Sequence, residues 1–336
     1  MAWLIIILLT LCCHMSQGQI TQRIDVIVAQ DGSGNYTKIS DAILAAPSFR
    51  RKPYYIKIKE GNYTEYVVVG REKTNLVLIG NGINNTIISG NKSHGKDHLS
   101  TYQTATVAIK GAGFVAMNIT FENTAGPDQE TGQAVALVSE VDSAFYRCKL
   151  DGYQDTLYAK SNKQFYRECD IYGTIDFIFG DASAVFQNCN IYVRFLGGNV
   201  KTITAEGREK PEGNGGIIIH NCTITAAEDF SENRTSIKTY MGRPWRNYSR
   251  TVILQTFLDE IIDPEGWLEW QGQSVDTIYY AEYNNRGRGS NTTGRVRWKG
   301  FRIIKRLEAE NFTVKKFISG NKWIPSTGIP FFPGLL

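Results

Sequence analysis

Short runs of β-branched and aromatic residues, bounded by Gly or Asn, fill most of this chain. The runs that read most clearly as strands are Tyr54–Ile58, Leu76–Ile79, Thr86–Ile88 and Ile217–Ile224, because this length and composition are typical of β-strands. Helical periodicity is scarce, and the best helix candidate is the short segment Ile39–Ala46. The pattern predicts an all-β fold.

Several segments resemble one another at a regular interval. One phrase, an aromatic or aliphatic pair followed by polar residues, Cys or Asn and an aliphatic residue, recurs at Phe114–Ile119, Phe145–Leu150, Phe165–Ile171, Val185–Ile191 and Ile218–Ile224. The clearest match aligns Gly152–Tyr158 with Gly173–Phe179, 21 positions later. A propeller blade takes about 40 residues, so a coil of roughly 21 residues favours a parallel β-helix, a solenoid whose coils stack about 4.8 Å apart.

No Pro- or Ser-rich linker interrupts the chain, so we predict a single domain over residues 19–336. The repeat is lost in 225–336, which we expect to supply loops, outer strands and a terminal cover for the stack. The formal net charge of +4 over 336 residues does not support a nucleic-acid partner and is compatible with an acidic polymer.

Residues 1–18 are typical of a secretory signal peptide. Trp3–Cys13 is almost purely apolar, and the small residues Ser16 and Gly18 precede an expected cleavage before Gln19. This apolar run is too short for a membrane span, which needs roughly 20 residues. We therefore expect a secreted protein with no membrane segment. Ten Asn-X-Ser/Thr sequons agree with secretion, at Asn35, Asn62, Asn84, Asn91, Asn118, Asn221, Asn233, Asn247, Asn291 and Asn311.

The expected mature chain keeps four cysteines: Cys148, Cys169, Cys189 and Cys222. Two interpretations stay open. An even number of cysteines in an oxidising compartment permits disulfides, with Cys148–Cys169 as the candidate pair; alternatively, the cysteines are small buried core residues. No C-x-x-C spacing supports a zinc site.

Two carboxylates and two amides follow the same interval of 21 residues. Asp155 aligns with Asp176, and Gln133 aligns with Gln154. On adjacent coils the carboxyl groups would come close enough for one pKa to rise and the other to fall, which would give an acid and a base or nucleophile. Amide donors beside them could stabilise an oxyanion. The alternative is that these residues only form outward-facing turns.

The segment Gly242–Arg246 adds to the catalytic interpretation. Arg243 can hold one carboxylate ionised through charge and paired hydrogen bonds, and Trp245 offers a flat face to a sugar. The alternative places Arg243 in a surface ion pair and Trp245 in the core. The scarcity of histidines and the absence of a G-x-S-x-G motif argue against a Ser–His hydrolase and a His-rich metal site.

These residues lie within motifs that resemble the plant-type pectin methylesterase (pectinesterase) family over nearly the whole expected mature chain. The motifs are Gln30–Gly34, Gly61–Glu65, Asn123–Pro127, Gln133–Leu137, Gly152–Asp155, Gly173–Gly180, Gly242–Trp245, Tyr248–Thr251, Gly266–Trp270 and Asp276–Tyr280. The resemblance implies a right-handed parallel β-helix. It also implies secretion to the cell wall, where the enzyme removes methyl esters from homogalacturonan.

The resemblance assigns a role to each candidate. Asp176 would be the nucleophile and Asp155 the proton donor. Gln154, together with Gln133, would stabilise the oxyanion, and Arg243 would orient Asp176. The expected substrate-binding residues are Thr101, Gln133, Arg243, Trp245 and Trp267. The family implies no metal or organic cofactor, and we expect a monomer. A proteinaceous pectinesterase inhibitor is a partner that the resemblance leaves open.

The chain departs from the family pattern directly before Gln133. Pro127–Gly132 spans six residues where most relatives have four, so the position of Gln133 is an open point. Val138 stands where the family usually has Arg, and we expect no inhibitor-like pro-region before the catalytic domain.

Two other functions stay open. One is another pectin-active β-helix enzyme, a lyase or glycosidase, since the spacing of Asp155 and Asp176 alone would also suit a glycosidase. The other is a non-catalytic pectin-binding protein.

Overall fold

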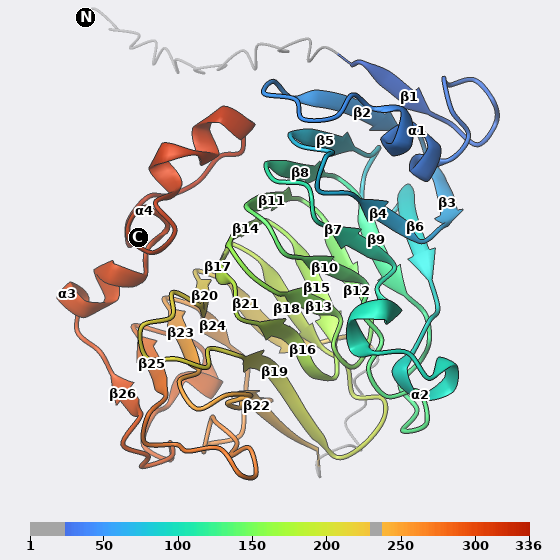
Figure 1. Cartoon of the computed structure of the whole chain (residues 1–336). Coiled ribbons are helices and arrows are strands. Elements are labelled where there is room, and N and C mark those ends of the chain that lie inside the picture. Colours follow the sequence, from blue (N-terminus) through green and yellow to red (C-terminus); the bar gives the residue numbers. More distant parts are fainter. Residues whose placement is uncertain (1–23, 229–236) are drawn as a thin grey trace, which may run out of the picture.

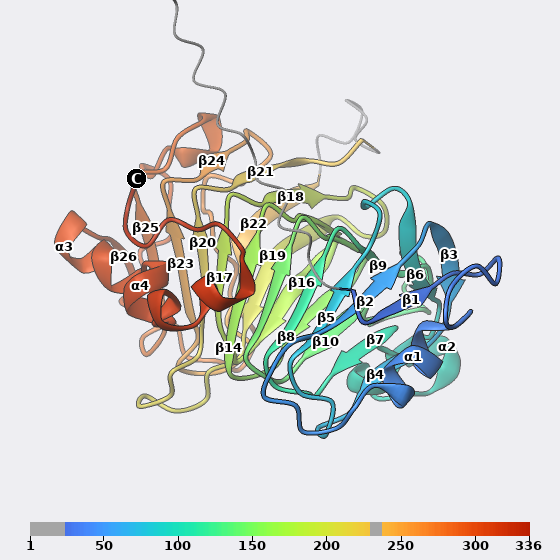
Figure 2. The same ribbon diagram turned by 90° about the horizontal axis from the view of Figure 1, so that it is seen from above.

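The computed structural model describes residues 24–228 and 237–336. The predicted signal peptide, residues 1–18, and the sequon at Asn233 lie outside these ranges. The described residues build a parallel β-helix from three sheets, in which each complete coil adds one strand to every sheet (Figures 1 and 2). This confirms the predicted all-β solenoid.

Within the described residues the largest sheet has 11 strands, in the order β1 Val26–Val28, β2 Tyr54–Ile58, β5 Leu76–Ile79, β8 Phe114–Met117, β11 Ser143–Tyr146, β14 Lys163–Arg167, β17 Ser183–Gln187, β20 Gly216–His220, β23 Arg250–Leu254, β25 Tyr279–Tyr283 and β26 Phe301–Ile303. The second has eight, β24 Phe257–Leu258, β21 Thr223–Ala226, β18 Asn190–Val193, β15 Asp170–Gly173, β12 Lys149–Asp151, β9 Thr120–Asn123, β6 Thr86–Gly90 and β3 Gly61–Thr64. The third has seven, β22 Lys238–Gly242, β19 Val200–Glu206, β16 Ile175–Gly180, β13 Leu157–Ala159, β10 Leu137–Ser139, β7 Val107–Ile109 and β4 Val67–Val69.

Helices are short in the described part of the chain. They are α1 Ile39–Ala45, α2 His94–Asp97, α3 Arg306–Ala309 and α4 Val314–Phe317, with 3₁₀ turns at Thr101–Thr104, Arg288–Ser290, Glu310–Phe312, Gly320–Lys322 and Ile324–Thr327. Helix α1 matches the predicted helix to within one residue, and it packs near β1 and β4 at the N-terminal end of the stack (Figure 1). None of these helices is long and apolar enough to cross a membrane.

The interval of 21 residues holds for only part of the stack. One column of the 11-stranded sheet pairs Ala116, Phe145, Tyr166, Phe186 and Ile219 in turn. These residues are 29, 21, 20 and 33 positions apart, because residues inserted between strands lengthen some coils without changing the stacking. Three of their rings stack inside the helix, with centroids 4.9 Å apart for Phe145 and Tyr166 and 4.5 Å apart for Tyr166 and Phe186.

The recurring sequence phrase turns out to be a corner between two sheets. Five residues directly follow a strand of the 11-stranded sheet and have positive φ angles of 58°, 51°, 52°, 57° and 52°: Asn118, Arg147, Glu168, Asn188 and Asn221. A residue with left-handed φ turns the chain sharply, so at each phrase the chain passes from a strand of the 11-stranded sheet to one of the eight-stranded sheet. The run predicted as one strand at Ile217–Ile224 is therefore β20 and β21, separated by this corner.

The four cysteines of the described residues form a buried column just inside the corner. Cys148, Cys169, Cys189 and Cys222 are all 0–1% exposed, and all are free thiols. The predicted Cys148–Cys169 disulfide is therefore wrong, and the core interpretation holds. Burial raises the pKa of the Cys169 and Cys222 thiols, which keeps them protonated and suits a packing role.

The C-terminal part continues the stack further than the repeat indicated. Strands β22, β23, β25 and β26 add regular pairing as far as Ile303, so the strands expected in 225–336 continue the sheets of the stack. The cover itself is the segment 304–336, whose apolar residues pack on the outer face of the 11-stranded sheet. It is the red segment beside the stack in Figures 1 and 2.

Candidate active site

A cavity of about 410 Å³ opens over the seven-stranded sheet. Seven of the eight predicted site residues line it: Thr101, Gln133, Gln154, Asp155, Asp176, Arg243 and Trp245. Residues from sequence positions more than 140 apart meet here because consecutive coils return to the same sheet. Sequence reasoning missed several other lining residues, among them Tyr102, Tyr158, Phe179 and Trp270.

Asp176 sits on a bulge in β16. Ile175 pairs with Thr202 and Ile178 pairs with Thr204, so the β16 segment carries one extra residue relative to β19. Asp176 has a φ of 51°, a conformation that Asp tolerates better than most residues. Bulges re-aim side chains and are frequent beside active sites. Here the bulge places the carboxyl of Asp176 in the cavity.

Thr202 on the neighbouring strand holds Asp176 at two points. Its hydroxyl accepts from the Asp176 backbone N–H at 3.0 Å and donates to Asp176 Oδ1 at 2.6 Å. Arg243 completes the set with two parallel bonds, Nε to Oδ1 at 2.9 Å and Nη2 to Oδ2 at 2.6 Å. A paired guanidinium–carboxylate contact fixes the plane of the carboxyl group and stabilises its ionised form.

Asp155 lies one coil away in the same register. Leu157 pairs with Ile178 and Tyr158 with Phe179, each 21 positions later, and the Asp155 N–H donates to Ile175 O at 3.0 Å. Its φ of 64° repeats the left-handed backbone of Asp176. The predicted juxtaposition of the two carboxylates is thereby confirmed.

The surroundings of Asp155 favour its neutral form. Burial raises the pKa of Asp155 well above the ordinary value of 3.8, and the charge of Asp176 raises it further, while Arg243 acts in the opposite direction. Asp155 and Asp176 are both buried, at 8% and 4% exposed, and the two hydrogen bonds from Arg243 go to Asp176. Two identical groups are thus set up for different chemistry, one as an acid and one as a nucleophile or base.

Two glycines explain why the motif repeats. A Cβ at Gly173 would lie 2.1 Å from Cβ of Phe177, and a Cβ at Gly152 would lie 2.8 Å from Oγ1 of Thr156. Each glycine therefore leaves room for the residue four positions later, directly after the aspartate. The same close turn is built twice, once per coil, and it presents Asp155 and Asp176 in the same way.

Both predicted amides reach the cavity. Gln154 directly precedes Asp155, and Gln133 comes from the previous coil, where the N–H of the next residue, Ala134, donates to Gln154 O at 3.1 Å. The longer Pro127–Gly132 loop therefore leaves Gln133 at the site. Amide donors in a half-buried cavity can stabilise developing negative charge on an oxygen.

Aromatic side chains form one wall of the cavity. Tyr158 and Phe179 stack with centroids 4.3 Å apart, and Trp245 meets both edge-on at 6.4 and 5.9 Å. The guanidinium of Arg243 lies 4.2 Å from the ring centroid of Trp270. Flat aromatic faces beside hydrogen-bonding groups suit a sugar chain, which presents both C–H and O–H groups.

The predicted contact between Trp267 and substrate is wrong. Trp267 is 1% exposed and packs on Tyr280 with ring centroids 4.4 Å apart. Its backbone bridges Gly242, next to Arg243, so it supports the site from inside. Trp270, three residues later in the same motif, is the tryptophan that lines the cavity.

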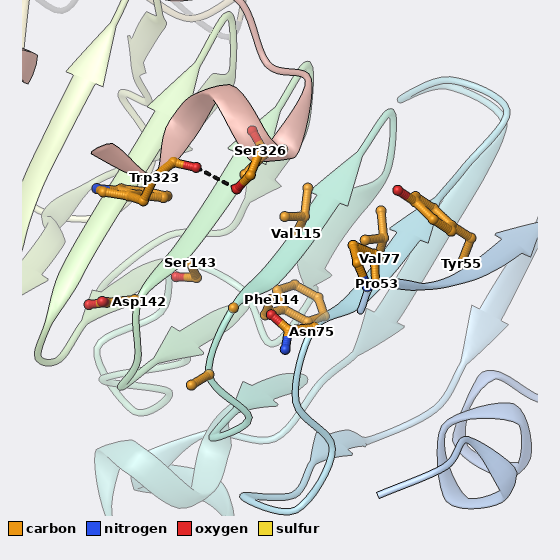
Figure 3. Close-up of a pocket in the computed structure, with 13 residues that line it drawn as sticks. Pro53, Tyr55, Asn75, Val77, Phe114, Val115, Asp142, Ser143, Trp323 and Ser326 are labelled. Carbon is orange, nitrogen blue, oxygen red and sulfur yellow. Dashed lines mark hydrogen bonds between the residues drawn. The ribbon is translucent and has the colours of Figure 1, made fainter. Parts of the chain in front are cut away.

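A second cavity, of about 270 Å³, lies between the 11-stranded sheet and the C-terminal segment. Figure 3 shows Trp323 and Ser326 beside the strand that carries Val115, with Tyr55 further along the sheet. Its only carboxylate is that of Asp142, which accepts from the Lys163 N–H at 2.9 Å. It contains no acid pair, so the chemistry belongs to the first cavity.

Neither the cavity nor the rest of residues 24–228 and 237–336 gathers three or more His, Cys, Asp or Glu side chains in a way that could hold a metal ion. The side chains that the site offers for chemistry have been described above. These are two carboxyl groups, two amides and a guanidinium within an aromatic wall.

Comparison with known proteins agrees with this geometry. Residues 25–321 match the model of the Pectinesterase family. The chain is 51% identical over 320 residues to pectinesterase 2 of Citrus sinensis, covering 94% of this chain and 62% of that protein. The structure superposes on pectin methylesterase from carrot with a TM-score of 0.91 and 46% identity, covering 94% of this chain and 99% of that one.

More distant solved structures share the fold. A pectin methylesterase determined in complex with a hexasaccharide superposes with a TM-score of 0.72 at 26% identity, covering 94% of this chain and 99% of that one. The curated relatives are longer than this chain, which spans between about half and about three fifths of their length.

Proposed function

Because the chain belongs to the pectinesterase family, we propose that it is a carboxylic ester hydrolase acting on the methyl esters of cell-wall homogalacturonan. The reaction converts pectin and water into pectate and methanol. The observation that carries this proposal is the pairing in one cavity of Asp176, held by Arg243, with Asp155, whose pKa is raised by burial and by the charge of Asp176. That pair supplies a nucleophile and a proton donor for ester cleavage.

In the first half of the reaction the Asp176 carboxylate attacks the ester carbonyl carbon. The carbonyl oxygen becomes an oxyanion, which accepts hydrogen bonds from the side-chain amides of Gln154 and Gln133. The C–O bond to the methoxy group then breaks, and Asp155 gives its proton to the departing oxygen. Methanol leaves, and the galacturonate acyl group stays on Asp176 as an anhydride.

In the second half Asp155, now ionised, takes a proton from water. The resulting hydroxide attacks the galacturonyl carbon of the anhydride, the bond to Asp176 breaks, and the galacturonic acid departs and loses its proton to the solvent. Asp155 is again protonated and Asp176 again a carboxylate, so the cycle closes without a cofactor. Arg243 keeps the Asp176 carboxylate plane aligned in both halves, since its two bonds allow little rotation.

The substrate chain has a natural path along the aromatic wall. Trp245 and Trp270 both line the cavity, and the guanidinium of Arg243 lies over the ring of Trp270. Thr101 adds a hydroxyl from the 3₁₀ turn Thr101–Thr104. The hexasaccharide complex of a solved relative supports a polysaccharide as the ligand. We therefore assign substrate binding to Thr101, Trp245 and Trp270.

The direct test is methanol release from methyl-esterified pectin by the secreted protein. Asp176→Asn removes the nucleophile and should lower kcat by about a thousandfold or more. Asp155→Asn removes the proton donor and should lower kcat by about a hundredfold or more. The matched control is Asp170→Asn, which changes a half-buried aspartate on the eight-stranded sheet outside the cavity, and it should retain wild-type turnover.

The same assay separates the other functions considered. Shortening of the polymer without methanol would indicate a lyase or glycosidase. Tight pectin binding with no turnover at any pH would indicate a binding protein. Methanol release at wild-type rates by Asp176→Asn would overturn the proposed mechanism.

Secretion to the cell wall is part of the proposal. Seven of the described sequon asparagines are exposed, at Asn35, Asn62, Asn84, Asn91, Asn247, Asn291 and Asn311, while Asn118 and Asn221 are half-buried corner residues. Secretion would be supported if the protein were found in the medium and its molecular mass fell after endoglycosidase treatment. A monomeric state and binding of a proteinaceous inhibitor stay predictions from the family, to be checked by light scattering with and without the inhibitor.

A further inference from the structure

The segment 243–250 carries Arg243 and Trp245 but contains no helix and joins β23 only at its last residue. Something must therefore hold it in place. Its backbone runs beside the end of β19 and the residues that follow. Arg243 N donates to Thr204 O at 3.0 Å, and Trp245 N donates to Glu206 O at 3.2 Å. This segment is called the 243–250 loop below.

The Glu206 side chain closes the far end of the loop. Its Oε2 accepts from the backbone N–H of Arg250 at 2.5 Å and from that of Arg208 at 3.1 Å. One carboxyl oxygen thus joins the end of the 243–250 loop to the residues after β19. Arg208 reinforces the junction, because its Nε donates to Tyr248 O at 2.6 Å.

Glu206 is unusual for a residue with only a structural task. Its side chain is fully buried, and its second oxygen, Oε1, has no hydrogen-bond partner among the described residues. Leaving a polar atom unpartnered in the interior costs free energy. The two hydrogen bonds that the Glu206 carboxyl accepts from backbone N–H groups offset that cost. They indicate that the side chain serves to join the two backbone segments.

We propose that Glu206 is a positioning residue that holds the 243–250 loop, and through it Arg243 and Trp245, in the geometry that the active site requires. The inference rests on the proposed function, since its consequence for turnover is expressed through the ion pair with Asp176. Glu206 itself does not reach the cavity. Its neighbour Ala205 lines the cavity instead.

The electrostatic surroundings indicate which variant preserves the contact. Burial raises the pKa of Glu206 to about 8; the charge of Asp181 raises it, while the bonds from the Arg250 and Arg208 N–H groups and the charge of Arg208 lower it. The buried hydroxyl of Tyr280 also feels the Glu206 charge. At pH 6 the carboxyl is therefore neutral, and Gln is its closest substitute, with a carbonyl oxygen that can accept the same two bonds.

Three variants of Glu206 test the role. Glu206→Gln keeps the acceptor, Glu206→Leu removes it at similar volume, and Glu206→Asp withdraws it by one methylene with a smaller risk to folding. Asp181→Asn is the control, because it removes a nearby negative charge without a bond to the loop. Amide hydrogen exchange of peptides covering the 243–250 loop at pH 6 is measured together with kcat and KM for methyl-esterified pectin.

Glu206→Leu and Glu206→Asp should speed exchange in the loop about tenfold, the factor that a single hydrogen bond is typically worth. They should also lower kcat/KM about tenfold or more, while Glu206→Gln and Asp181→Asn stay within about twofold of wild type. Wild-type exchange in Glu206→Asp, or equal impairment of Glu206→Gln and Glu206→Leu, would overturn the proposal. If the wild type releases no methanol, the proposed function fails, and the exchange data alone decide the role of Glu206.

Discussion

Arg243 and Asp176 are 67 positions apart in the sequence, yet they form a paired contact of 2.9 and 2.6 Å. The side chain of Asp176 is 6% exposed and that of Arg243 is 26% exposed. An isolated carboxylate at such a position would be costly to desolvate. Arg243 therefore serves two purposes. Its positive charge compensates the desolvation cost of the Asp176 carboxylate, and its paired bonds fix the direction from which that carboxylate attacks.

Replacing Arg243 should impair turnover more than binding. Arg243→Lys keeps the charge but cannot make two parallel bonds, so kcat for methanol release should fall about a hundredfold with a smaller change in KM. The control is Arg147→Lys, which alters another arginine–carboxylate contact, 3.0 Å to Glu168, far from the cavity. Equal turnover by Arg243→Lys and wild type would show that the paired geometry is unimportant.

We expect activity and the free energy of unfolding both to fall as rising pH ionises Asp155. Its folded-state pKa is raised above the ordinary 3.8, so the folded protein keeps a proton that the unfolded chain loses. The stabilising effect of the neutral group is fully present below pH 3.8 and is lost as pH rises toward the folded-state pKa, by about 1.4 kcal/mol per pH unit at most.

Asp155→Asn removes that dependence because its amide cannot ionise. The variant should be almost inactive, yet its advantage in unfolding free energy over wild type should grow between pH 4 and pH 7, as measured by urea denaturation. The Asp170→Asn control should show a smaller pH-dependent difference, since Asp170 is less buried. If the unfolding free energies of the wild type and of Asp155→Asn changed with pH in the same way, that result would contradict the raised pKa of Asp155.

The repeat of Gly152–Tyr158 in Gly173–Phe179 was enough to predict the central geometry of the site. Stacked coils convert a sequence interval into a spatial register, so the aligned aspartates had to be neighbours. The segment Gly242–Arg246 offered Arg243 as a partner for one carboxylate, and the family resemblance assigned it to Asp176, because no periodicity shows its approach from a later coil. The length of a coil could be predicted only for the part of the stack where the interval of 21 residues holds. Elsewhere, inserted loops lengthen the coils without disturbing the pairing of the strands.

Side-chain direction in irregular segments was not predictable from the sequence. Trp267 and Trp270 lie within one motif, but the segment between them is not a strand, so alternation could not tell which one faces outward. The bonds of Thr202 to Asp176 and of Glu206 to the 243–250 loop depend on a bulge and on a junction of two coils. Both arise from tertiary pairing that leaves no short-range signal.

The two tryptophans should respond to truncation in opposite ways. Trp270→Ala should raise KM for pectin several-fold and leave the melting temperature nearly unchanged, because Trp270 is half-buried at the cavity. Trp267→Ala should cost about 3–5 kcal/mol of unfolding free energy, as is typical for a buried aromatic residue, with a smaller effect on KM in the folded fraction. Thermal melts and steady-state kinetics on both variants decide the assignment.

The cysteine column makes a simple prediction about reductants. Since all four described cysteines are free thiols, adding dithiothreitol should leave the melting temperature of the secreted protein unchanged. A structural disulfide would instead contribute about 2–5 kcal/mol, and its reduction would lower the melting temperature by several degrees. Mass spectrometry after alkylation under denaturing conditions gives an independent count of free thiols, and fewer than four in the mature chain would contradict the structure.

Gly207 determines where Trp245 stands. A Cβ at this position would lie 2.7 Å from Cε3 and 3.1 Å from Cζ3 of the Trp245 ring, so even Gly207→Ala must push the indole away from its place beside Tyr158 and Phe179. We expect KM for the polymer to rise about tenfold while kcat changes less, because our proposal assigns Trp245 to the sugar chain and not to the reacting ester.

The matched control is Gly334→Ala, at a site where an added Cβ meets no atom within 4 Å. It makes the same chemical change near the C-terminus and should leave both constants at wild-type values. Quenching of tryptophan fluorescence by acrylamide should increase for Gly207→Ala but not for Gly334→Ala, since only the former displaces an indole toward solvent. If Gly207→Ala binds pectin as tightly as wild type, the position of Trp245 does not govern affinity, and the aromatic wall is not the path of the substrate.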